Sequence, residues 1–94
     1  MEEKILTLHP QGKRGVNISM QKYDVMKTAI IETLTEFEAL TFTELTQKIS
    51  EKLTGSFDGN IEWYVITVKL DLEARKILEG IPGTRPQKIR LTGA

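Results

Sequence analysis

The sequence predicts a small α+β domain in which three helices are followed by a C-terminal β-hairpin. Two segments repeat apolar side chains at positions i, i+3, i+7 and i+11, and a third repeats them at i, i+4, i+7 and i+11; both are spacings of one helix face. Near the C-terminus the spacing changes to the alternation of a half-buried strand. The 94 residues suit one domain, so we expect a single domain over 1–94, with 1–17 as an N-terminal arm and loop.

The N-terminal segment is expected to be extended. Residues 3–9 partly alternate between polar and apolar side chains, which is typical of a strand or an extended arm. Pro10, Gly12 and Gly15 then predict a loop over 9–15.

The first two helices carry recognisable N-terminal signals. Ser19 is a good N-cap for a first helix that is expected to end near Thr35. A short extended segment at 40–42 follows, and Thr41 with Glu44 forms a capping box for the second helix. Gly55 suits the end of that helix. The predicted core faces are Tyr23, Met26, Ile30 and Leu34 in the first helix, and Phe42, Leu45, Ile49 and Leu53 in the second.

The third helix is predicted from about Asp58 to Glu79. The run WYVITV at 63–68 is β-branched and aromatic, which favours a strand, but the flanking KLDLEARKILE favours a helix. Gly80 ends this helix or begins a strand. A hairpin then follows, with PGTRPQ at its tip and the alternating KIRLT at 88–92 as its second strand. The predicted core stripe of the helix is Ile61, Val65, Val68 and Leu72.

This order of elements is that of a winged helix, with a short strand after the first helix and the C-terminal hairpin as the wing. TFTELTQKISEKL resembles the second helix of such domains, and WYVITVKLDLEARKILEGI resembles their third helix leading into the wing, within a likeness that spans roughly 18–92. More narrowly, HPQGKRGVNI, KYD at 22–24 and WYVITVKLDLEAR resemble a family of small uncharacterised bacterial winged-helix proteins. That resemblance implies the fold and no particular activity.

Composition excludes several classes of function. The chain has no cysteine, so disulfides, thiolate catalysis and cysteine-ligated zinc are excluded, and His9 has no second histidine with which to share a metal. No apolar run approaches the ~20 residues of a membrane helix, and the acidic N-terminus is unlike a signal peptide. We therefore expect a cytoplasmic protein without membrane contact, metal, cofactor or enzymatic activity.

Basic residues are gathered near the two ends of the chain. Residues 28–80 hold ten acids and five bases, whereas 81–94 hold three bases and no acid. The adjacent Lys13 and Arg14 are suited to phosphate contacts, although a solvated turn is the more ordinary role for such a loop. Cations on a wing bind the DNA backbone or discourage edge-to-edge aggregation. The candidate nucleic-acid-binding residues are Lys13, Arg14, Arg85, Lys88 and Arg90.

The third helix is predicted to be apolar on two opposite faces. Its second face, which carries Trp63, Ile66 and Leu70, needs a cover because a helix apolar nearly all round is normally buried. The wing, the N-terminal arm or a second copy of the protein are the alternatives, and the last would make these three residues an interface. An acidic helix with a second apolar face is poorly suited to a DNA groove.

Two functions therefore remain open. Many winged helices bind double-stranded DNA, which favours a small transcriptional regulator by analogy of fold. The alternative is a protein-interaction or dimerisation module that does not bind DNA. Convergence of the five cations on one surface would favour the first, and exposure of the apolar face would favour the second.

Overall fold

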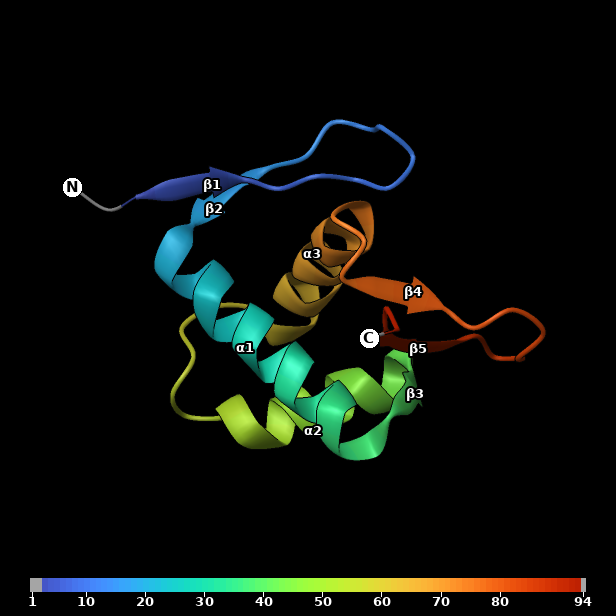
Figure 1. Cartoon of the computed structure of the whole chain (residues 1–94). Coiled ribbons are helices and arrows are strands. Elements are labelled where there is room, and N and C mark those ends of the chain that lie inside the picture. The colour runs from blue at the N-terminus through green and yellow to red at the C-terminus, as the bar shows by residue number, and fades with distance from the viewer. Residues whose placement is uncertain (1–2, 94) are drawn as a thin grey trace.

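The computed structural model describes residues 3–93 and has an α+β fold with three helices and two antiparallel sheets (Figure 1). Its order of helices and strands is compatible with the winged-helix arrangement that the sequence predicts. The helices are α1 (Met20–Phe37), α2 (Phe42–Leu53) and α3 (Ile61–Ala74). The strands are β1 (Lys4–Leu6), β2 (Asn17–Ser19), β3 (Ala39–Thr41), β4 (Leu78–Gly80) and β5 (Lys88–Leu91).

The larger sheet has three strands and contains the C-terminal hairpin. Its strand order is β3-β5-β4, so the C-terminal hairpin β4–β5 pairs with the short strand that follows α1. Leu40 lies opposite Ile89, and both side chains are buried. This register follows from the predicted alternation, because the apolar residues of each strand must face the helices.

The predicted N-terminal caps of α1 and α2 are confirmed. The Ser19 hydroxyl accepts a hydrogen bond from the amide of Lys22. The amide of Glu44 donates to the Thr41 hydroxyl at 3.2 Å, and the Glu44 carboxylate accepts from the Thr41 amide at 2.9 Å. These two bonds form the capping box and lower the pKa of Glu44.

The third helix is shorter than the predicted span from Asp58 to Glu79. It begins after Asn60, whose side-chain oxygen accepts from the Trp63 amide at 3.0 Å. It ends because Lys76 adopts a left-handed φ of 66° and the Ile77 amide donates back to the carbonyl of Leu72. A helix end of this Schellman type commonly has glycine at the left-handed position. Because lysine occupies that position here, the sequence pattern did not indicate where the helix ends.

The core lies between the three helices and the inner face of the larger sheet. Val65, Val68 and Leu72 of α3 are fully buried, whereas Ile61 is only partly buried. The predicted face of α1 is buried throughout, and α2 buries Leu45 and Ile49. The predicted apolar stripes therefore pack against one another, which is the arrangement that their helical spacing required.

The N-terminal arm is a β-hairpin, which the sequence did not predict. β1 pairs with β2, and Ile5 lies opposite the buried Ile18. The two strands approach so closely beyond this pair that a Cβ atom on Gly15 would lie 1.6 Å from the Thr7 carbonyl oxygen. Only three residues form β2 before α1 begins, which is too short for alternation to identify a strand.

Candidate functional site

The outward face of α3 carries the three predicted interface residues. Trp63 is 43% exposed and Ile66 is 41% exposed, whereas Leu70 is half-buried. Residues three and four apart on a helix are neighbours, so these side chains form one stripe along α3. The side of the helix opposite its buried face is therefore apolar and largely uncovered along its first half.

The N-terminal hairpin partly covers the second half of this stripe. A cleft of about 110 Å³ separates the two elements, and its wall includes Thr67 and Leu70 from α3 with Leu8 and Val16 from the hairpin. Leu8 and Val16 are themselves exposed. The apolar surface thus continues from the helix onto the hairpin. We call it the α3–hairpin surface, and it consists of Leu8, Val16, Trp63, Ile66 and Leu70.

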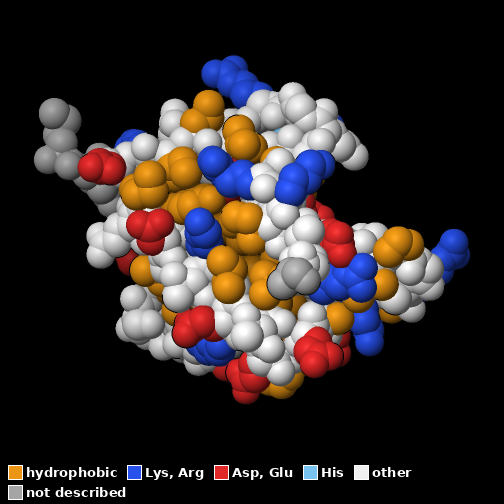
Figure 2. All heavy atoms as spheres, in the orientation of Figure 1, with side chains coloured by type: hydrophobic (Ala, Val, Ile, Leu, Met, Phe, Trp, Pro, Cys, Tyr) orange, Lys and Arg blue, Asp and Glu red, His pale blue; other side chains and the backbone are white. Residues whose placement is uncertain are grey.

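Apolar exposure is concentrated near this part of the molecule. Figure 2 shows hydrophobic side chains reaching the surface in a band that runs from the β1–β2 hairpin toward α3 and α1. Among the large apolar side chains most exposed in the described chain, five of seven belong to α3 or to the N-terminal hairpin segment. Contiguous apolar exposure of this kind marks interaction surfaces more often than scattered single residues do.

The five predicted nucleic-acid-binding residues fall into two separate groups. Lys13 and Arg14 lie in the loop between β1 and β2, whereas Arg85, Lys88 and Arg90 lie on the β4–β5 hairpin. Figure 1 shows these two hairpins projecting from different parts of the molecule. On the face in Figure 2, Lys and Arg side chains lie at several separate places with Asp and Glu side chains between them.

Two of the cations on the β4–β5 hairpin have acidic neighbours. Arg90 forms an ion pair with Glu79 across the hairpin, with 2.6 Å between Nε and the carboxylate oxygen. Lys88 lies opposite Thr41 in the sheet, and its charge contributes to the lowered pKa of Glu44. Such neighbours reduce the positive potential that the β4–β5 hairpin presents to a phosphate.

A buried carboxylate on α3 is the most connected polar group in the described chain, and sequence reasoning missed its role. One Asp71 oxygen accepts from the Leu8 amide at 2.8 Å, and the other accepts from the Tyr23 hydroxyl and from Arg75 Nε at 2.9 Å. Asp71 is fully buried. The only sequence signal was the four-residue spacing from Asp71 to Arg75, which is that of a helical ion pair.

Hydrogen bonds and charge interactions with Tyr23 and Arg75 stabilise the buried Asp71 carboxylate. Burial raises the pKa of Tyr23 to about 12, and the hydrogen bond to Asp71 adds to the shift. The same carboxylate raises the pKa of Arg75. A buried charge requires such partners because removing an unpaired carboxylate from water is very costly. With three donors already engaged, the Asp71 carboxylate joins the segment after β1 to α1 and α3 and has a structural role.

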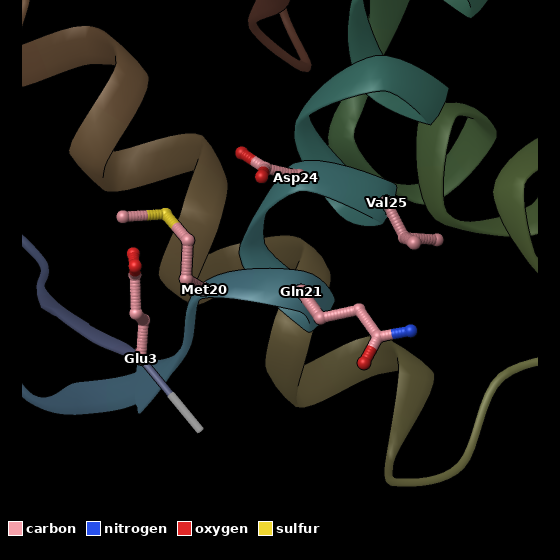
Figure 3. Close-up of a pocket in the computed structure, with 5 residues that line it drawn as sticks. All are labelled: Glu3, Met20, Gln21, Asp24 and Val25. Atoms are coloured by element: carbon pink, nitrogen blue, oxygen red, sulfur yellow. The ribbon is translucent and has the colours of Figure 1, made fainter. Parts of the chain in front are cut away.

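Two further features bear on ligand binding. Within residues 3–93, no group of three or more His, Asp or Glu side chains is placed to hold a metal ion. An open depression of about 440 Å³ lies at the start of α1, where Glu3 extends alongside Met20 and Asp24 lies one turn further (Figure 3). Among residues 3–93, no helix is long and apolar enough to span a bilayer.

The chain belongs to DUF6958, a family of unknown function, which it matches over residues 4–89. No curated protein matches it significantly, and no solved structure does so either. The family description assigns no activity, so function has to be argued from the geometry of the α3–hairpin surface and of the cations.

Proposed function

We propose that this member of DUF6958 is a self-associating interaction module, in which the α3–hairpin surface packs against the same surface of a second copy. The observation that carries this proposal is the exposure of Trp63 and Ile66, each more than two fifths accessible to solvent, on the outward side of α3. A helix that reads base edges in a DNA groove carries hydrogen-bond donors at such positions.

The charge of the protein suits association between identical copies. Thirteen basic and thirteen acidic residues leave a formal charge of zero, so two molecules do not repel each other through net charge. Beside the apolar stripe, Lys69 and Glu73 already neutralise each other at 2.9 Å. An interface of two-fold symmetry brings each surface against its own copy, and a nearly neutral apolar surface is self-complementary in that arrangement.

The size of the surface indicates a weak dimer. Complete burial of a large apolar side chain contributes about 1.5–3 kcal/mol, and Trp63 and Ile66 are already more than half covered. Association itself costs at least about 4 kcal/mol in lost translational and rotational freedom. The five side chains of the α3–hairpin surface, taken from both copies, contribute about 1 kcal/mol each, or about 10 kcal/mol together. The net gain of about 6 kcal/mol corresponds to a dissociation constant on the order of 10–100 μM.

Sedimentation velocity over about 5–500 μM protein tests this proposal, since that range brackets the expected dissociation constant. The average mass is expected to rise toward the dimer in the wild type and to stay monomeric in Ile66→Glu, because a buried unpaired carboxylate opposes association. Val25→Glu is the matched control, since Val25 is also 41% exposed but lies on α1. A wild type that remains monomeric throughout, or a Val25→Glu variant that dissociates as Ile66→Glu does, contradicts the proposal.

Backbone contacts to double-stranded DNA are a second candidate function, because Lys13, Arg14 and Arg85 are exposed in two projecting hairpins. The ion pairs of residues 3–93 involve other cations. Affinity from such contacts falls steeply with salt and does not depend on sequence.

Fluorescence anisotropy of a labelled random duplex at low and moderate salt tests DNA binding. Binding that weakens as salt rises, and that Lys13→Glu with Arg85→Glu abolishes, is the expected result. Lys52→Glu, on an exposed site in α2, serves as the charge control. Absence of binding at tens of micromolar protein in low salt rejects this function.

A further inference from the structure

The N-terminal hairpin gives the outward side of α3 the shape of a step. The hairpin lies over the second half of the helix, where its Leu8 amide donates to Asp71 and its side chains line a cleft with Leu70. Figure 1 shows the β1–β2 hairpin at the end of α3 from which the chain continues into β4. The first half of α3 carries Trp63 and is largely uncovered. One half of this surface is therefore raised, and the other half is low.

The cleft between the hairpin and α3 is suited to the edge of an aromatic ring. Its volume is about 110 Å³, and its apolar walls are formed by Leu8 and Val16 of the hairpin and by Leu70 of α3. Arg14 also lines it, and none of the described residues around it is acidic. The ion pairs within residues 3–93 do not involve Arg14. Its guanidinium group is therefore available to pack on an indole ring, the best aromatic partner of a cation.

Trp63 lies on the same stripe of α3 as this cleft. Trp63, Thr67 and Leu70 occupy positions i, i+4 and i+7, so they project from one side of the helix. The rise from Trp63 to Leu70 is about 10 Å along the helix axis, and Trp63 does not line the cleft of its own chain. Its ring is 43% exposed although it packs edge-on against Tyr64. A protruding aromatic ring and a cleft thus lie about two helical turns apart on one surface.

We propose that the Trp63 ring of each copy inserts into the cleft of a second copy, an arrangement that rests on the self-association proposed above. A two-fold axis that crosses α3 between Ile66 and Thr67 passes midway between the ring and the cleft. That axis places Trp63 of one copy opposite Leu70 of the other, and the reverse contact forms at the same time. The two α3 helices run antiparallel, and each raised hairpin lies beside the low half of the partner's helix. Each cleft is incomplete without the partner's indole ring.

Parallel packing of the two helices does not fit the same surface. If the two-fold axis runs along α3, each residue faces its own copy, so Trp63 meets Trp63 and hairpin meets hairpin. The raised hairpins then collide before the low halves touch, and both clefts stay open to water. The antiparallel arrangement instead brings the low half of one copy against the raised half of the other. The step in the surface therefore determines the direction in which the helices pair.

Tryptophan fluorescence tests the insertion, because Trp63 is the only tryptophan in the sequence. A trace of wild-type chain is mixed with excess Trp63→Ala, which keeps the cleft and has no tryptophan. The wild-type emission is expected to shift to shorter wavelength, and its quenching by acrylamide is expected to fall. Adding Val16→Glu to the Trp63→Ala chain should abolish both changes, whereas Val25→Glu, at an equally exposed site on α1, should preserve them. Equal shifts with both double variants, or no shift although sedimentation shows a wild-type dimer, overturn the insertion and leave self-association standing.

Isotope-filtered NMR of the wild type identifies what the indole ring contacts in the second copy. In an equal mixture of isotope-labelled and unlabelled chains, NOEs are expected between the Trp63 ring protons of one copy and the Leu8 and Val16 methyl groups of the other. NOEs between the two Trp63 rings instead indicate parallel helices and overturn the proposal. Absence of any intermolecular NOE, together with a monomeric mass in sedimentation, rejects both this arrangement and the self-association on which it rests.

Discussion

At the scale of single residues, Asp71 determines how the N-terminal hairpin meets the helices. Its carboxylate accepts from the Leu8 amide of the hairpin, from the Tyr23 hydroxyl of α1 and from the Arg75 side chain at the end of α3. Breaking a buried charged pair costs about 3–5 kcal/mol because the remaining charge is left without compensation. The cluster therefore stabilises the packing of three segments that are distant in sequence.

Tyr23 makes the stability of the protein sensitive to alkaline pH. Its pKa is about 12 in the folded protein and 10 in the unfolded chain, so the folded state retains the hydroxyl proton more strongly. This contribution is fully present below pH 10 and is lost as pH rises from 10 through 12. We expect the free energy of unfolding to fall by on the order of 2 kcal/mol over that interval from this group alone.

Urea denaturation of the wild type and of Tyr23→Phe between pH 8 and pH 12 measures this effect. Lysine residues titrate in the same range, so the difference between the two proteins is the informative quantity. Tyr23→Phe is expected to be less stable at pH 8 and to lose less stability at higher pH. Parallel pH profiles for the two proteins would show that the Tyr23 proton is not linked to folding.

At the scale of elements, the sequence predicted those features whose causes are local. The Ser19 and Thr41 caps each depend on a side chain that bonds an amide within three residues, and both were read correctly. The flanking KLDLEARKILE correctly indicated a helix for WYVITV. Its boundaries were wrong because the end depends on the backbone of Lys76, which residue type did not reveal.

Features of long range could not be read from the sequence. Asp71 lies between Leu70 and Leu72, and its partner Tyr23 is 48 residues earlier, so no local pattern connects them. The pairing of β1 with β2 likewise depends on contacts with the helices. The exposed stripe of Trp63 and Ile66 was visible on a helical wheel, whereas its partial cover by the hairpin was only one of several alternatives.

The end of α3 provides a prediction about backbone conformation. Lys76 has a φ of 66°, which costs roughly 1 kcal/mol for a residue with a Cβ atom but little for glycine. Lys76→Gly is therefore expected to raise the free energy of unfolding by about 0.5–1 kcal/mol. Lys69→Gly, inside the same helix, is the control and is expected to lower it by about 1 kcal/mol. Chemical denaturation would contradict this account if both variants were destabilised equally.

At the scale of the whole molecule, the N-terminal hairpin links α1 to the C-terminal half of α3. Its backbone binds Asp71 through Leu8, and its side chains line the cleft over Thr67 and Leu70. Thr7 is buried where the two strands meet, and both its amide and its hydroxyl donate to the Val16 carbonyl. The hairpin therefore behaves as part of the folded unit, and its displacement is expected to weaken the packing of both helices.

Gly15→Ala tests this linkage. A Cβ atom at that position would lie 1.6 Å from the Thr7 carbonyl oxygen. The two backbones cannot move apart enough to remove this clash without separating the strands. Separation withdraws the Leu8 amide from Asp71 and leaves a buried carboxylate short of one donor, which costs about 1–3 kcal/mol beyond the lost strand pairing. Amide hydrogen exchange is expected to accelerate in both β1 and the last turn of α3. Gly12→Ala is the control: its φ of 74° disfavours alanine, but no atom lies within 4 Å of the added Cβ, so its cost stays local to the loop. Equal effects of the two substitutions on unfolding free energy, with exchange in α3 unchanged, would mean that the hairpin folds independently of the helices it contacts.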